Sequence, residues 1–136
     1  MISDKAKSML ADHIVSTFTK ANVGAGGNTT NPTQLDLDVP LLTSKITATP
    51  TKSDENVIDF KITIAGSSAD ISGRSLREVG IFDSGSCSNS SYSTESTCTA
   101  AGATWTEALF TRLNFDALGP FSSSEEVEFF ISVEVE

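Results

Sequence analysis

The chain has 136 residues, with 18 acidic and 9 basic side chains and a formal net charge of -9 at pH 7. This length suits one domain with a single hydrophobic core, and the acidic excess argues against a partner that presents a phosphate backbone. No stretch approaches the roughly 20 apolar residues that a membrane-spanning helix needs. We therefore expect one domain, residues 1–136, that binds no nucleic acid and does not insert into a membrane.

The first 22 residues have the apolar spacing of an amphipathic helix. Ser3 is a suitable N-cap, and Asp4 places a negative charge where it favours the helix dipole. Apolar residues then recur at spacings of three and four, at Ala6, Met9, Leu10, Ile14 and Phe18. Because charges at positions 4, 5, 7 and 12 fall where the apolar part of a signal peptide would lie, we expect no secretion signal.

Residues 23–40 are predicted to form a connector or arm. The segment "VGAGGNTTNP" has three glycines, two asparagines and a proline, which end the helix and favour turns. The following "LDLDV" alternates at Leu35, Leu37 and Val39 but runs into Pro40, which cannot donate to a sheet ladder. An edge strand or an extended arm therefore fits this segment better than a central strand.

Residues 41–136 change to the period of two that indicates β-strands. Two segments have a fully apolar face, "NVIDFKITIAG" and "EEVEFFISVEVE". These faces comprise Ile58, Phe60, Ile62 and Ile64, and then Val127, Phe129, Ile131, Val133 and Val135. The glutamates at 125, 126, 128, 134 and 136 are predicted to form a solvated strand face. Weaker strand candidates are "SKITATP", "SLREVGIFD" and "EALFTRLNF".

No helical segment separates these strands along the chain. A parallel sheet needs such crossover segments, so the pattern excludes a parallel α/β fold. We predict a mainly β protein, an antiparallel β-sandwich over 41–136 with one N-terminal amphipathic helix and a long inserted loop.

The inserted loop, residues 83–106, is rich in Ser and Thr and holds the only two cysteines, Cys87 and Cys98. A zinc site lacks further ligands, and a C-x-x-C redox motif is absent. A disulfide that braces the loop, worth on the order of 3 kcal/mol in the chain-entropy model, is the simplest interpretation. Two free thiols, or a bond between chains, are the alternatives. Tyr92 and Trp105 are candidate contact residues, and Trp105 either caps the core or stands exposed.

The sequence has no group of residues typical of catalysis. His13, the single histidine, falls on the predicted helix. The stretch "VGAGGN" lacks the lysine of a phosphate-binding loop and follows a helix rather than a strand. We therefore expect no enzymatic activity, no cofactor and no metal site.

The segments "LREVGIFDS" and "ALFTRLNFDALGPFSSSEEVEFFISVEVE" resemble a pattern in small virion proteins of tailed bacteriophages, including tail-fibre and baseplate modules. The matching positions are Glu78 to Phe82, then Leu109, Arg112 and Phe115, then 127–135, with a similar Gly-rich connector at Val23, Gly24, Gly26, Pro32 and Thr33. In that family a brief turn joins the first two strands, so the 83–106 loop is a departure. The stretch "CSNSSYSTESTCTAAGATW" is itself similar to a cysteine-loop insert in virion proteins of aquatic phages.

The resemblance implies a non-enzymatic structural subunit of the virion, in the tail, baseplate, fibre or neck. Such a subunit would assemble into a ring or trimer with copies of itself and with other virion proteins, docking through the N-terminal helix and the 24–39 arm. The alternative for the amphipathic helix is that it folds back on its own sheet. It would be made in the host cytoplasm and released into oxidising surroundings, where the cysteines can pair late. The alternatives are a receptor- or glycan-binding module that uses the loop, and a capsid decoration protein.

The "EVGIF" motif also suggests two local contacts. Gly80 permits either a close approach of another segment or a bulge in its strand. Glu78 and Arg112 could form an ion pair across adjacent strands.

Overall fold

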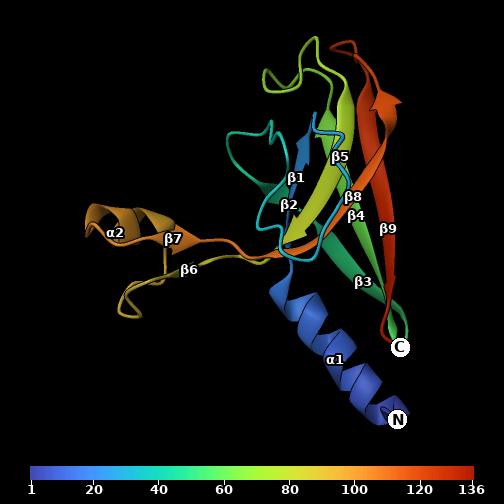
Figure 1. Ribbon diagram of the computed structural model, residues 1–136, viewed down its shortest axis with the longest axis vertical. Helices are drawn as coiled ribbons and strands as arrows, with labels where there is room; N and C mark the ends of the chain where they lie inside the picture. Colours follow the sequence, from blue (N-terminus) through green and yellow to red (C-terminus); the bar gives the residue numbers. More distant parts are fainter.

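The computed structural model describes all 136 residues as a β-sandwich with a helix at one end and a small lobe at one side (Figure 1). The elements are α1 (Asp4–Thr17), β1 (Lys20–Gly24), β2 (Ile46–Thr47), β3 (Thr49–Asp54), β4 (Val57–Ala65), β5 (Leu76–Phe82), β6 (Ser86–Cys87), α2 (Glu95–Ala100), β7 (Trp105–Thr106), β8 (Leu109–Leu118) and β9 (Glu126–Glu134). Every strand pair is antiparallel. The predicted fold class is confirmed.

Two sheets form the sandwich. One has four strands in the order β2-β1-β5-β8, and the other has three in the order β3-β4-β9. The chain passes from the first sheet to the second at Ala48, which separates β2 from β3 and is fully buried. The Ala48 N–H donates to the carbonyl of Thr19 at 2.9 Å. This bond ties the corner to the segment between α1 and β1.

The core lies between the sheets, where the two predicted apolar faces meet the inner side of β1 and β5. Ile58, Phe60, Ile62 and Ile64 of β4 are all buried. The inward residues of the last segment are buried or half-buried, at Val127, Phe129, Ile131, Val133 and Val135. The five glutamates near the C-terminus are exposed, which confirms the solvated face, although Glu125 lies in the turn before β9. Alternation of apolar and polar residues therefore identified the inner faces correctly.

Helix α1 begins as predicted and packs on one end of the sandwich. The Ser3 hydroxyl accepts a hydrogen bond from the Ala6 N–H at 3.2 Å, which is an N-cap contact. Ala11 is fully buried, and the residues three, four and seven positions further on pack against the core. The Phe18 ring, just after the helix, stacks on Phe110 with centroids 4.4 Å apart. The Lys52 ammonium fastens the helix to β3 through the Asp12 carboxylate at 3.0 Å.

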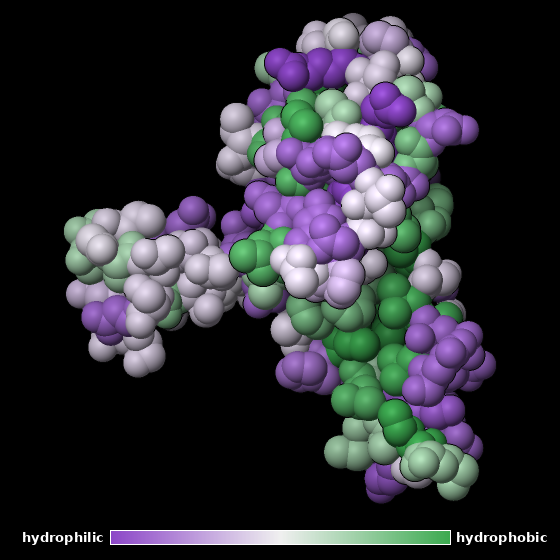
Figure 2. Space-filling model, in the orientation of Figure 1, coloured by the Kyte–Doolittle hydropathy of each residue, from purple (hydrophilic) through white to green (hydrophobic).

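The predicted apolar stripe of the helix is wrong in its centre. Met9 and Leu10 are 62% and 46% exposed, whereas Ala11, outside the predicted stripe, is buried. Apolar residues lie on two sides of this helix, and only one side can contact the end of the sandwich. Figure 2 shows apolar residues gathered in the region where Figure 1 draws α1.

Residues 20–24 form a strand, where a helix end and a connector were predicted. This strand, β1, lies between β2 and β5 and pairs with β5 over its whole length, from Lys20 opposite Phe82 to Gly24 opposite Glu78. The stretch "KANVG" has neither strong alternation nor high β-propensity. Its conformation is set by pairing with a segment more than 50 residues away in the chain, which local pattern cannot indicate.

Residues 25–39 form an irregular arm with turns and bends, and not an edge strand or an extended segment. The arm starts and ends at one place, because Gly24 and Pro40 form an isolated bridge and the Ala25 N–H donates to the Val39 carbonyl at 3.0 Å. Of its alternating apolar residues only Leu37 is buried, while Leu35 is exposed. The arm therefore crosses the outer side of the four-stranded sheet with one apolar anchor.

The turn before β9 contains a carboxylate with a shifted pKa. Glu125 has a pKa below its ordinary value because its carboxylate accepts hydrogen bonds from Ser122, whose backbone N–H lies 2.7 Å away. Folding lowers this pKa, so the stabilisation is present at neutral pH and is lost as the pH falls through the lowered value. We expect an NMR titration of Glu125 to give a lower pKa in the folded chain than in urea. Equal values in the two states would contradict this contact.

Candidate functional site

The predicted loop forms a compact lobe that projects from the sandwich (Figure 1). Its neck is tied at the base, because the Asp83 N–H donates to the Ala108 carbonyl at 3.0 Å. The Asp83 carboxylate in turn accepts from the N–H groups of Gly85 and Ala108 at 2.9 and 2.8 Å. Beyond the neck, β6 pairs with β7, with Cys87 opposite Trp105. The lobe is thus a braced hairpin and not a loose loop.

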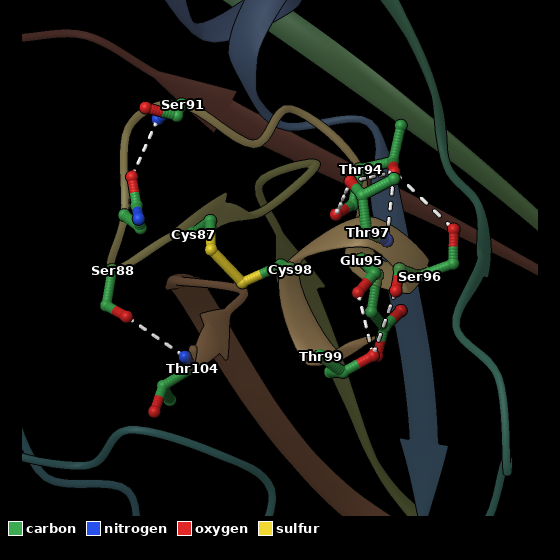
Figure 3. The surroundings of a disulfide bond; sticks show 11 residues. Cys87, Ser88, Ser91, Thr94, Glu95, Ser96, Thr97, Cys98, Thr99 and Thr104 are labelled. Atoms are coloured by element: carbon green, nitrogen blue, oxygen red, sulfur yellow. Dashed lines mark hydrogen bonds between the residues drawn. A yellow bond between two sulfur atoms is a disulfide. The ribbon is translucent and has the colours of Figure 1, made fainter. Parts of the chain in front are cut away.

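The predicted disulfide is present and joins residues of one chain. Cys87 in β6 is bonded to Cys98 in α2, with 5.8 Å between their Cα atoms, and no free cysteine is left. Figure 3 shows the bond between the hairpin and the helix, with the Thr94 hydroxyl capping α2 by accepting from the Thr97 N–H at 3.3 Å. Helix α2 was not predicted. Its six residues, "ESTCTA", are too few and too rich in Ser and Thr to be helical alone, so the cap and the disulfide stabilise it.

Loss of the disulfide should loosen the lobe and leave the sandwich intact. We expect the Cys87→Ser/Cys98→Ser variant to lose about 3 kcal/mol of local stability in the lobe, from the entropy of the opened loop. No residue of the hydrophobic core cluster lies between positions 83 and 106. Hydrogen exchange should therefore accelerate at 86–106 and stay unchanged in β4. An equal loss of protection in β4 would contradict a separate lobe.

The two candidate contact residues lie together on the lobe. Tyr92 and Trp105 are both half-buried, and with Ser86, Ser90 and Ser93 they line a shallow depression of about 360 Å³. Trp105 is not among the residues that pack on the sandwich core, so the alternative in which it caps that core is wrong. Its indole lies against Gly85, where φ is +94° and a Cβ atom would overlap the ring. A glycine is therefore required there on both counts.

A larger hollow separates the lobe from the sandwich. This cleft, of about 410 Å³, is lined from the sandwich side by Lys20, Leu42, Thr43, Ser44 and Lys45, and from the lobe and its neck by Ser84, Glu95, Trp105 and Glu107. The Lys45 ammonium lies 3.3 Å from the Glu107 carboxylate, and both side chains are largely buried. Of these nine residues, only Trp105 is predicted from the sequence as a contact residue. No motif spacing joins the others, because they come from five separate segments of the chain.

The predicted pair of Glu78 and Arg112 is confirmed and is buried. Arg112 Nε and Nη2 each lie 2.7 Å from Glu78 Oε2, and the two side chains are 2% and 0% exposed. The residues belong to the neighbouring strands β5 and β8, where Arg112 is opposite Gly80 and Glu78 is opposite Asn114. The contact is therefore diagonal across the sheet, between residues two positions apart in register.

This ion pair holds the arm on the outer side of the sheet. The Glu78 carboxylate accepts from the N–H groups of Asp38 and Val39 at 3.0 and 2.8 Å. Arg112 Nη1 donates to the Asn28 carbonyl at 2.8 Å. Between the two charges, the absent side chain of Gly80 leaves room for Leu37, since a Cβ atom there would lie 2.8 Å from Leu37 Cδ2. Of the two roles predicted for Gly80, the close approach is the one observed.

The remaining features concern the single histidine, possible metal ligands and the length of the helices. His13 is exposed on α1, with Nε2 3.5 Å from the Thr17 hydroxyl. The structure contains no group of three or more His, Cys, Asp or Glu side chains placed to hold a metal ion. Neither helix has the length and apolar character to cross a bilayer.

Comparisons with family models, with curated proteins and with solved structures find no match. The resemblance to tailed-phage virion proteins therefore stays a prediction from the residues of β5, β8 and β9.

Proposed function

We propose that the chain is a non-enzymatic structural subunit of a tailed-phage virion, in the tail, baseplate, fibre or neck. It assembles with copies of itself into a ring or trimer and contacts other virion proteins. The observation that supports this proposal most is the uncovered apolar side of α1.

That side carries Ala6, Met9 and Leu10, which at spacings of three and four lie on one face of the helix. Met9 and Leu10 are exposed, as are Met1 and Ile2 just before the helix. Burying a side chain of this size is worth about 1.5–3 kcal/mol, and a contiguous exposed apolar patch commonly marks a protein contact. A neighbouring copy that covered this face would recover that free energy.

The first test is the solution mass by light scattering, with and without reductant. We expect a discrete trimer or ring that survives reduction, because the disulfide is within one chain and distant from α1 in the sequence. Met9→Glu/Leu10→Glu should give monomers, since it puts two charges into the contact. Phe130→Glu is the matched control, because Phe130 is an exposed apolar residue on the outer face of β9. A monomeric parent chain under both conditions would contradict self-assembly through α1.

The virion assignment needs a separate test. Mass spectrometry of purified particles from the phage that encodes the chain should find its peptides, with a copy number that is a multiple of the solution oligomer. Purified particles without these peptides would contradict the assignment. A capsid decoration protein differs from this proposal only in its position on the particle, which the copy number would identify.

The second candidate function is a receptor- or glycan-binding module. The observation in its favour is that Tyr92 and Trp105 share one depression on a lobe that projects away from the sandwich. Because Asp83 and Ala108 tie the neck, residues 84–107 can be replaced by a short turn without cutting a sheet ladder of the sandwich. Binding to a glycan array that this replacement abolishes would favour the module.

A further inference from the structure

We propose that the cleft between lobe and sandwich binds a neutral carbohydrate, with Trp105 as the stacking surface. This inference deepens the second candidate function. It moves the binding site from the outer depression at Tyr92 to the inner cleft, and it names the class of ligand.

The two walls of the cleft are formed by different segments of the chain. Lys20 comes from β1, and 42–45 precede β2, while Glu95 begins α2 and Trp105 begins β7. Its volume of about 410 Å³ lies in the range of about 300–1,000 Å³ that small-molecule sites occupy. Only two of its nine lining residues are hydrophobic, so an apolar ligand would leave most of the polar lining unpaired.

The charges of the cleft favour a neutral ligand. Two lysines, Lys20 and Lys45, face two glutamates, Glu95 and Glu107, so the local charge balances although the whole chain carries -9. An anionic ligand would meet the glutamates, and a cationic ligand would meet the lysines. Hydroxyl groups both donate and accept, so a polyhydroxylated ligand can donate to carboxylates and accept from ammonium groups within the same site.

The two lysines of the cleft differ in whether their ammonium groups already take part in other contacts. Lys45 is engaged with Glu107 and also lies 4.5 Å from the centroid of the Phe82 ring. Lys20 takes part in none of the four ion pairs of the structure. The Lys20 ammonium is thus the cation that a ligand hydroxyl can engage without breaking an existing contact.

Trp105 supplies the apolar surface that one face of a sugar ring needs. The residue is half-buried and held from two sides, by pairing with Cys87 across the hairpin and by contact with Gly85. Since Cys87 is bonded to Cys98, the disulfide fixes β6, and β6 pairs with the strand β7 that carries the indole. An aromatic surface that is already in place loses little conformational entropy on binding. The outer depression, by contrast, has no charged lining residue to engage several hydroxyls.

The test uses the oxidised full chain on a glycan array that presents neutral and acidic glycans. Trp105 is the only tryptophan, so its fluorescence in a titration with the bound glycan reports binding beside its indole. Because this side chain lines both the cleft and the outer depression, variants at Lys20 and Tyr92 distinguish the two sites. We expect neutral glycans to bind and to shift the emission. Trp105→Ala and Lys20→Gln should each weaken binding about tenfold or more, as loss of a central contact does. Tyr92→Ala, which changes only the outer depression, should leave binding unchanged.

Three results would overturn the proposal. These are binding of acidic glycans alone, binding of no glycan, and binding that Tyr92→Ala abolishes and Lys20→Gln leaves intact. Light scattering on the same samples tests the assembly proposal independently of glycan binding. An oligomer without glycan binding would contradict only the carbohydrate site, and a glycan-binding monomer would contradict only self-assembly.

Discussion

Glu78→Ala is expected to lower the free energy of unfolding by about 3–5 kcal/mol, as removal of one partner from a buried ion pair does. The Arg112 guanidinium is 2% exposed and would stay buried without its counter-charge. The same change removes the acceptor of two N–H groups of the arm, at Asp38 and Val39. We therefore expect faster hydrogen exchange along 26–39 together with the loss of stability, measured by urea unfolding.

An exposed ion pair of the same sandwich provides the control. Lys61 and Glu128 lie 3.6 Å apart on the outer face of β4 and β9, with side chains 52% and 40% exposed. Lys61→Ala should cost at most about 1 kcal/mol, because solvent screens such a pair. If Glu78→Ala costs no more than Lys61→Ala, the buried pair does not hold the arm.

A double variant distinguishes the effect of the two buried charges on stability from the effect of the side-chain volume. Glu78→Leu/Arg112→Met removes both charges and keeps apolar volume, so it should recover part of the stability that Glu78→Ala loses. It does not restore an acceptor for the two arm N–H groups, so the arm should stay more exposed to exchange than in the parent chain. Arm protection equal to that of the parent would mean that apolar packing alone seats the arm.

Phe60→Ala is expected to cost about 3–5 kcal/mol, which is a large part of the about 5–15 kcal/mol that stabilises a domain of this kind. Phe60 is fully buried in β4, between Pro50 of β3 and Ile131 of β9 in the sheet register. Its ring centroid lies 6.3 Å from that of Phe110, which belongs to β8, so the side chain joins the two sheets. Its loss leaves a cavity between them.

Phe130→Ala is the matched control, with the same chemical change on the opposite face of the same sheet. Phe130 is 69% exposed, and the Lys61 ammonium lies 6.0 Å from its ring centroid. We expect a cost of less than about 1 kcal/mol, since little apolar area is buried there. Thermal unfolding of both variants by circular dichroism measures the difference. Similar costs would contradict the assignment of inner and outer faces.

Local patterns were sufficient for the elements whose signals are contained within a few residues. The period of two in β4 and β9 identified the buried faces, because successive side chains of a strand point to opposite sides. Ser3 marked the start of α1, because a cap acts on the N–H groups of the next turn. The spacing of Cys87 and Cys98 allowed their bond, and the absence of other ligands made it the simplest interpretation.

The tertiary structure alone decided the features that depend on distant partners. Residues 20–24 are a strand because β5 lies beside them, and α2 is a helix because a cap and a disulfide hold a six-residue segment in which Ser, Thr and Cys are weak helix formers. The helix α1 has two apolar sides, and its packing on the sandwich core determines which of them is buried. The cleft joins Lys20, Glu95 and Trp105 from segments far apart in the chain. The sequence by itself determined which strand residues face the core and which residue caps α1, because those features depend on neighbours a few positions away. Which distant segments meet depends on long-range packing, so only the tertiary structure decided it.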